Sequence, residues 1–454
     1  MKKIILSLVG LLAAAVFAPQ ASALPAFARQ TGMECTACHQ QHFPVLNTFG
    51  RAFKAAGYTM MGAQPLVEGE HLSIPNTLNA AILIKTRYQR QSNATQGTRD
   101  GAGTGTGDGQ WQLGNEFSLF FGGRVGENIG FLMENNVANE GALIAGLRLP
   151  FMFDVAGAKV SAIPFSTDAL GVSYGYELSS AGVMRANRWA EMRRDTSAIQ
   201  YAIADANGSH AAWAGAASGL ALVVQNDMGF INYTRWTPNA MPGGNDGAIA
   251  SYGPNSNYLR IAVTPTVADW AIVAGAGMMS GSSELAGAGN GTAFDPAAAI
   301  YVPATTATAD SGLVKTEARF ADFQAHGQVA GNDMGVYVTY AVAPADESAT
   351  GVQAQMFNTG KLEKSAMAIG VDYSLIPHTL HVGAAYRTAD TGKATATDAN
   401  TSQTDNAVML QVIYDLTQNV ALHVAAASRD GTKYSQPAAA TGAKEYVFML
   451  EAAW

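Results

Sequence analysis

Large apolar residues alternate with small or polar residues along many short stretches of this chain. In the stretch 366–375, one face carries Met367, Ile369, Val371, Tyr373 and Leu375. The opposite face carries Ala366, Ala368, Gly370, Asp372 and Ser374. The stretch 380–387 repeats the pattern, with Leu380, Val382, Ala384 and Tyr386 opposite His381, Gly383, Ala385 and Arg387. A period of two, with bulky apolar groups on one face only, predicts β-strands that lie between lipid and a polar lumen.

The connections between these stretches alternate in length. Short turns are expected at 126–128, 225–227, 266–269, 331–333, 376–378 and 416–419. Long segments rich in Gly, Ala, Thr and Ser are expected at 92–111, 237–256, 282–312, 344–361, 389–404 and 430–442. Short turns on one side and long loops on the other are typical of outer-membrane barrels. A soluble β-sandwich is the alternative, but it would not sort its loops by length in this way.

The predicted fold is therefore all-β, a transmembrane antiparallel β-barrel. We count about sixteen to eighteen strands and choose sixteen, because single-chain bacterial barrels have an even number. The chain stops on Trp454 at the end of an alternating stretch, which resembles the terminal strand that outer-membrane barrels present to their assembly machinery. Alternation fails between 140 and 217. The basic stretch 185–194 within it is either a helix folded into the lumen or a solvated loop.

Composition agrees with an exported β protein. Charged residues make up 14% of the 454 residues, and glycine occurs 48 times, whereas about 25% charged residues is usual. The formal net charge is −8. A nucleic-acid-binding protein would normally be basic, so this class is excluded.

The first 23 residues have the three parts of a secretory signal peptide. Lys2 and Lys3 precede the apolar run 4–17, and the small residues 21–23 form a cleavage site. The run is shorter than the roughly 20 residues of a spanning helix. We therefore expect cleavage before Leu24, export, and a location in the outer membrane.

Both cysteines of the chain lie close to this predicted new N-terminus. Cys35, Cys38 and His39 form the sequence C-x-x-C-H, which is the attachment site of a c-type haem. Two thiols add to the vinyl groups, and the following imidazole supplies the proximal iron ligand. A redox dithiol would require a thioredoxin-like βαβ setting. A zinc site would require further ligands such as His42 and His71, whose spacing matches no common pattern. One covalently bound haem c is therefore predicted.

A short helix is expected after the motif. Pro44 suits its first turn and Gly57 suits its end. Apolar residues fall at helical spacing between them, at Leu46, Phe49, Gly50 and Phe53. This face would cover either a haem edge or the barrel wall.

The second axial ligand is left open by the sequence. Met60, Met61 and His71 lie far enough downstream to return over the haem. Methionine is slightly favoured, because it raises the reduction potential relative to a second histidine.

Two other stretches have suggestive chemistry. The segment 99–110 spaces Asp and Gly as a calcium loop does, but lacks the terminal Glu, so a plain loop is expected. The inward positions Asp372, Asp415, His381 and Arg387 could handle Fe²⁺ or haem propionates, or simply line a wet channel.

The stretch 24–58 resembles the fused monohaem cytochrome–porins of the outer membrane, which are implicated in iron oxidation by neutrophilic and acidophilic iron-oxidising bacteria. The likeness rests on Pro25, the run 27–32, the haem motif, Phe43-Pro44, Phe49-Gly50-Arg51 and Phe53-Lys54. The barrel matches only in architecture.

This resemblance implies an oxidoreductase that takes electrons from extracellular Fe(II) through its haem. A periplasmic c-type cytochrome or similar carrier would accept them. Cys35 and Cys38 would be the thioether sites and His39 the proximal ligand. No iron-binding residues carry over.

Three parts of the chain are thus expected: a signal peptide at 1–23, a cytochrome segment at 24–70 and a barrel at 71–454. The cytochrome segment is short for an independent domain, so it should plug the lumen. Two other functions stay open, a transport porin with a haem plug and an electron conduit for another extracellular redox partner.

Overall fold

The structure is a computed structural model that describes most of the chain. The described ranges are 25–41, 45–62, 64–92, 109–137, 144–167, 171–178, 193–203, 217–238, 254–284, 292–295, 300–303, 313–347, 354–435 and 442–454. The predicted signal peptide, most of the segment 99–110, and His42 lie outside them.

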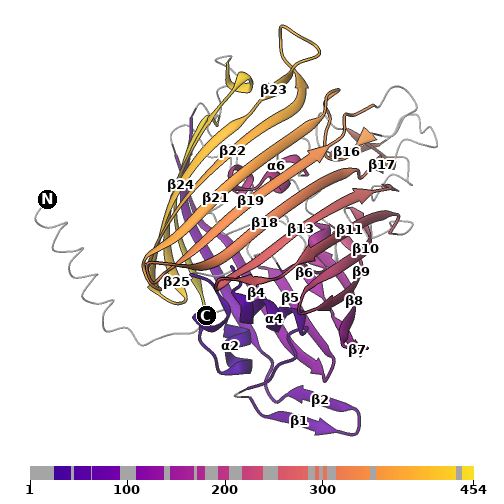
Figure 1. Cartoon of the computed structure of the whole chain (residues 1–454), viewed down its shortest axis with the longest axis vertical. Coiled ribbons are helices and arrows are strands. Elements are labelled where there is room, and N and C mark those ends of the chain that lie inside the picture. Colours follow the sequence, from indigo (N-terminus) through magenta and orange to yellow (C-terminus); the bar gives the residue numbers. More distant parts are fainter. Residues whose placement is uncertain are drawn as a thin grey trace, which may run out of the picture.

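A closed antiparallel β-barrel forms the main body (Figure 1). Its strands are β3 (Ala80–Gln91), β4 (Gln110–Gly126), β5 (Ile129–Asn136), β6 (Ile144–Arg148), β7 (Phe151–Val155), β8 (Ala158–Thr167), β9 (Ala217–Asn226), β10 (Gly229–Pro238), β11 (Ser256–Val263), β12 (Thr266–Val267), β13 (Trp270–Ser280), β18 (Ala318–Val329), β19 (Asn332–Ala343), β21 (Lys364–Ile376), β22 (Leu380–Ala394), β23 (Ser402–Thr404), β24 (Asn406–Thr417), β25 (Val420–Asp430) and β26 (Lys444–Ala453). The pairs β6–β7, β11–β12 and β23–β24 are each one interrupted strand, so the described residues form sixteen strands, as predicted. Pairing of β26 with β3 closes the ring.

Smaller elements lie at the two ends of the barrel and inside it. The other strands are β1 (Leu66–Gly69), β2 (Leu72–Pro75), β14 (Ser282–Glu284), β15 (Thr292–Asp295), β16 (Ile300–Pro303), β17 (Leu313–Lys315) and β20 (Ala354–Gln355). The helices are α2 (Pro25–Thr31), α3 (Cys35–Cys38), α4 (Thr48–Ala55), α5 (Arg193–Thr196) and α6 (Ala198–Ala202), with 3-10 turns η1 (Val172–Tyr174) and η3 (Thr432–Tyr434). Among the described residues, no helix is long and apolar enough to span a membrane.

The two faces of the barrel wall differ as the alternation predicts. On β21, Met367 and Ile369 are exposed, whereas Ala368 and Asp372 are buried. Exposed apolar side chains recur around the outside at Leu220, Leu222, Val224, Ile231, Ile261, Val263, Val408, Leu410, Val412, Val424, Phe448 and Leu450. An apolar surface of this extent is suited to lipid rather than to water.

The short turns gather at one end of the barrel, called here the short-turn end (lower end in Figure 1). The chain reverses at 127–128, 227–228, 268–269, 330–331, 377–379 and 418–419, which confirms the six predicted turns. A seventh turn, at Ala156 and Gly157, was not predicted because the stretch around it does not alternate; both residues have positive φ, 50° and 82°. In outer-membrane barrels this end faces the periplasm.

One predicted loop is partly wrong. The segment 389–404 was expected to be a long polar loop, but β22 continues to Ala394, where Ala394 pairs with Ser402. The strands extend because threonine, abundant there, has high β propensity. The predicted boundary between residues 70 and 71 falls in the turn of the β1–β2 hairpin, and barrel pairing begins at Ala80.

Two inward segments occupy the lumen. In 171–178, Glu177 is fully buried and pairs with Arg260 of β11, which also binds Asp322 of β18 at 2.6 Å. In 193–203, α5 and α6 pack inside the wall formed by β19, β21 and β22 (Figure 1). The end of the basic stretch therefore folds into the lumen, which was one of the two alternatives; residues 179–192 lie outside the described ranges.

The lipid-facing assignment of the outer surface can be tested with Leu410→Arg. Leu410 is 57% exposed near the middle of β24. An arginine near the bilayer midplane should lower the free energy of unfolding by about 2–4 kcal/mol. Guanidinium unfolding from lipid vesicles measures this. The control is Thr397→Arg, in an exposed connection, and equal stability of the two variants would contradict the assignment.

Candidate functional site

The described parts of the N-terminal segment, 25–41 and 45–62, lie at the short-turn end of the barrel (Figure 1). It bonds to distant parts of the wall. The Cys35 amide donates to Gln418 Oε1 at 3.1 Å, in the β24–β25 turn. Gln41 Nε2 donates to the Asp333 carbonyl oxygen at 3.1 Å, and Gln225 of β9 donates to the Ala55 carbonyl oxygen at 2.8 Å. The segment therefore plugs this end, as expected from its length.

The C-x-x-C-H motif forms a single helical turn. Helix α3 contains both cysteines, and the His39 amide donates to the Cys35 carbonyl oxygen at 2.9 Å. The two thiols do not form a disulfide. Burial raises the pKa of the Cys38 thiol, which disfavours the reactive thiolate of a redox dithiol.

The imidazole of His39 has a defined orientation. Its Nδ1 lies 3.3 Å from the Val45 carbonyl oxygen, which can accept a hydrogen bond from Nδ1–H. A proton on Nδ1 makes Nε2 the ring nitrogen with the lone pair, and such contacts orient metal-binding histidines. A covalent haem c requires two thiols to attach the porphyrin and one imidazole nitrogen to bind the iron. The residues of this turn therefore fit a haem c.

Helix α4 packs directly on the motif. The Asn47 side chain accepts from the Gly50 amide at 2.9 Å and donates to the carbonyl oxygens of Thr36 and Ala37 at 3.2 and 3.0 Å. A Cβ atom on Gly50 would lie 2.0 Å from the Cys38 carbonyl oxygen. Glycine at position 50 is therefore required for this close approach.

The predicted start of this helix is wrong. It begins at Thr48 rather than near Pro44, because Asn47 caps it. Leu46 therefore precedes the helix, and Pro44 itself lies outside the described residues. The predicted end is confirmed, since the helix stops at Ala55 and Gly57 follows with a φ of 61°.

An aromatic cluster, not predicted from the sequence, stabilises the segment. Phe27, Phe53 and Tyr58 pack with ring centroids 4.9–5.8 Å apart. Arg148 of β6 lies over the Tyr58 ring at 5.4 Å. The cluster ties α2 to α4 and both to the barrel wall.

The three candidates for the second haem ligand lie in different places. Met60 is 37% exposed and Met61 is half-buried, and the two follow Thr59 in the chain. His71 is at the tip of the β1–β2 hairpin, with 92% of its side chain exposed, 4.0 Å from Glu70. The hairpin projects beyond the short-turn end (Figure 1). The identity of this ligand stays a prediction.

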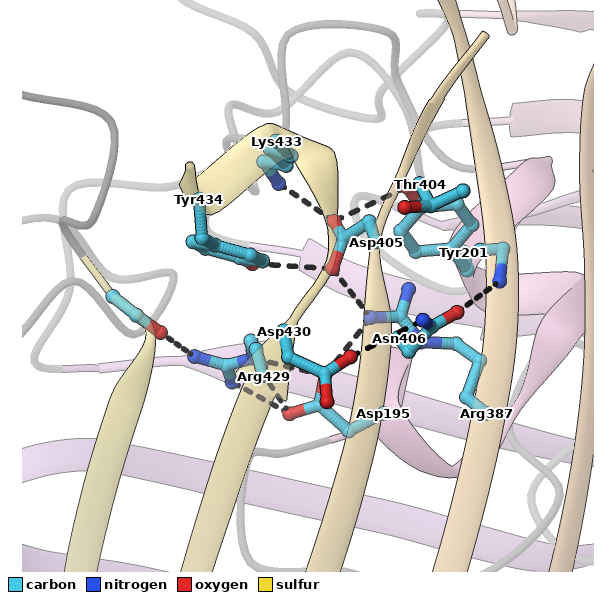
Figure 2. A network of polar contacts seen from close by, with 12 residues as sticks. Asp195, Tyr201, Arg387, Thr404, Asp405, Asn406, Arg429, Asp430, Lys433 and Tyr434 are labelled. Carbon is cyan, nitrogen blue, oxygen red and sulfur yellow. Dashed lines mark hydrogen bonds and ion pairs between the residues drawn. The ribbon is translucent and has the colours of Figure 1, made fainter. Parts of the chain in front are cut away.

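A second polar cluster lies higher in the lumen and binds α5 and α6 (Figure 2). The Asp195 carboxylate accepts from Arg429 at 2.5–3.1 Å and lies 3.6 Å from Arg387. The Arg387 guanidinium stacks over the Tyr201 ring at 3.9 Å. Tyr201 donates to Asp405 at 3.1 Å, and Asp405 also pairs with Arg387 at 2.9 Å.

The lumenal positions expected for Asp372, Asp415, His381 and Arg387 are confirmed, and all four side chains are buried. They do not form one site. Arg387 binds the inward helices, whereas His381 lies 2.8 Å from Asp415 nearer the short-turn end. Asp195 and Tyr201 were missed because the stretch 140–217 has no period to mark its lumenal residues.

No protein-family model matches the chain, and no curated protein matches it. Among solved structures it is similar to the outer membrane channel DcaP of Acinetobacter baumannii, with a TM-score of 0.47, 10% identity, and coverage of 86% of this chain and 99% of that one. It is also similar to a loop L8 deletion mutant of OmpT of Vibrio cholerae, with a TM-score of 0.45, 12% identity, and coverage of 83% of this chain and 99% of that one. For OccK10 of Pseudomonas aeruginosa, the TM-score is 0.41 and the identity 12%, with coverage of 83% of this chain and 99% of that one.

Replacement of both cysteines tests the haem motif. Cys35→Ser/Cys38→Ser should lose covalent haem completely, because no thioether can form. The barrel should still fold, since its strand pairing does not involve these side chains. Haem staining of denaturing gels and circular dichroism measure the two properties, with Thr36→Ala as control. A haem stain that survives in the double variant would contradict the assignment.

Asp195→Ala tests whether α5 and α6 restrict the lumen. The substitution removes the carboxylate that joins α5 to Arg387 and Arg429, while these arginines keep Asp405 and Glu445 as partners. We expect the helices to leave the wall and the single-channel conductance in planar bilayers to rise. The control is Asp398→Ala, in an exposed loop. If Asp195→Ala and Asp398→Ala both left the conductance unchanged, α5 and α6 would not limit the pore.

Proposed function

We propose that this protein is an outer-membrane electron-transfer protein that oxidises extracellular Fe(II) through one covalently attached c-type haem. The observation that carries the proposal is the C-x-x-C-H turn. It is built as one helical turn, covered by α4 and bonded to the barrel wall. A motif that arose by chance in a loop would have no such support.

The chain's own residues attach and orient the group. Cys35 and Cys38 would form the thioethers, and His39 would present Nε2 to the iron. Gln418 and Asn47 fix the backbone of the turn from two sides. When bound, a haem supplies one-electron chemistry at a potential tuned by its ligands and surroundings.

The proposed reaction balances simply. Fe(II) loses one electron and becomes Fe(III), and an oxidised periplasmic carrier gains that electron. Oxidised iron is insoluble near neutral pH, so a cell benefits when the metal stays outside. The position of the motif at the short-turn end favours delivery to a periplasmic c-type cytochrome.

A transport porin with a plug is the second candidate, and the closed barrel with its polar inner wall favours it. The segments 45–62 and 193–203 both bond to the inner wall of the barrel and weigh against free passage of solutes. An electron conduit to another extracellular donor would share the haem site and differ only in its substrate.

Stopped-flow visible spectroscopy of the purified, oxidised protein tests the iron assignment. Anoxic Fe(II) should produce the reduced α-band rapidly, as dithionite does. His39→Ala should lose this response, because the iron loses its proximal ligand, and Thr36→Ala should keep it. A haem that dithionite reduces and Fe(II) does not would refute Fe(II) as donor and favour the other two functions.

A further inference from the structure

Helix α4 carries a buried cation beside the haem motif. Arg51 follows Gly50, the residue in contact with the Cys38 carbonyl, and its side chain is only 6% exposed. Among the residues that the structure describes, its polar contacts are the Leu46 carbonyl oxygen at 3.4 Å and His326 Nδ1 at 3.3 Å. No described carboxylate pairs with this guanidinium.

The histidine beside Arg51 does not neutralise it. Because His326 Nδ1 accepts from Arg51, the ring proton is on Nε2, which lies 3.0 Å from the Tyr337 hydroxyl. His326 is therefore a neutral acceptor that holds the guanidinium in place. Tyr337 in turn hydrogen-bonds to the Asp372 carboxyl group. Burial lowers the pKa of Arg51 to about 10, as expected for a cation without a counter-charge.

A second cation, the half-buried Lys54, lies one turn further along α4. Burial and the nearby Arg148 guanidinium lower the pKa of Lys54 well below its ordinary value, while Glu177 acts in the opposite direction. Glu177, however, already pairs with Arg260 and accepts from Tyr258 at 2.6 Å.

The charges around α4 do not balance. Four cations, Arg51, Lys54, Arg148 and Arg260, face two carboxylates, Glu177 and Asp322. Arg260 takes both carboxylates, so Arg51, Lys54 and Arg148 have no carboxylate partner among the described residues, and this set of four cations and two carboxylates has a net charge of +2. A buried charge without a partner is costly, so a ligand with two negative charges would stabilise this arrangement.

We propose that Arg51 and Lys54 bind the two propionate carboxylates of the haem attached at Cys35 and Cys38. This inference rests on the proposed function. Its chemical basis is that a porphyrin of this class carries two carboxylates, and that a guanidinium donates to a carboxylate through two parallel N–H groups. His326 is the positioning residue for Arg51, because it binds the guanidinium from the wall.

Electrostatics gives a measurable consequence. A cation close to the propionates disfavours the ferric state, which has one more positive charge, and so raises the reduction potential. The same cation keeps the propionates ionised to lower pH. Loss of either cation should therefore lower the potential and raise the propionate pKa toward neutrality.

The experiment uses the full-length protein with its haem in detergent. Arg51→Gln, Arg51→Lys and Lys54→Gln are compared with the wild type by covalent haem content and by spectroelectrochemical titration between about pH 5 and about pH 9. We expect unchanged haem content in all three variants. Both glutamine variants should have a lower midpoint potential, and the pH range over which their potential changes should shift toward neutral pH. Arg51→Lys should show a smaller change in midpoint potential.

The matched control is Arg124→Gln. Arg124 lies at the same end of the barrel and donates to the Ser73 hydroxyl at 2.8 Å, and its loss should leave the potential unchanged. Full haem content with a wild-type potential and pH profile in both glutamine variants would overturn the proposal. A wild-type protein without haem would instead refute the proposed function. If Arg51→Gln does not fold, Lys54→Gln and Arg51→Lys decide the question.

Discussion

The closure of the hydrogen-bonded ring by β26 and β3 is the constraint on which the rest of this structure depends. In lipid, every backbone donor and acceptor must find a partner within the protein, and a sheet achieves this only when it has no open edge. The register from Glu445 opposite Gln91 to Ala453 opposite Leu83 supplies those last partners. Once the ring is closed, alternate side chains must point inward, whatever their polarity. The buried charges of the lumen follow from this geometry.

A lumen of this kind is stable only when its charges find partners. The inward segments supply them: Glu177 reaches Arg260, and Asp195 reaches Arg387 and Arg429. The N-terminal segment is held differently, by hydrogen bonds between uncharged groups, in which the amide groups of Gln418, Gln41 and Gln225 bond to backbone atoms. Arg51 of this segment contacts a neutral histidine instead of a carboxylate. The cations that contact α5 thus pair with carboxylates, whereas Arg51 of α4 has no carboxylate partner among the described residues.

The sequence allowed prediction of the barrel because its rule is local and periodic. Met367 and Ile369 face outward for the same reason as Tyr446 and Phe448, and six turns were placed from chain pattern alone. The haem motif was equally local. Asp195 and Tyr201 could not be foreseen, because they are selected by distant wall residues and not by their neighbours in the chain. The start of α4 was misplaced because a single side chain, Asn47, decided it.

The position of the motif limits how a donor can reach it. The apolar band of such barrels is about 25 Å tall, and electron tunnelling falls steeply with distance. A donor on the outer rim would be too far from a group held at the short-turn end by Gln418. Under the proposed function, Fe(II) must therefore enter the lumen, past α5 and α6, or another carrier must bridge the gap. The buried polar side chains of the inner wall include carboxylates and cations on neighbouring strands. Residues that handle the donor should accordingly be sought inside the barrel and not in its outer loops.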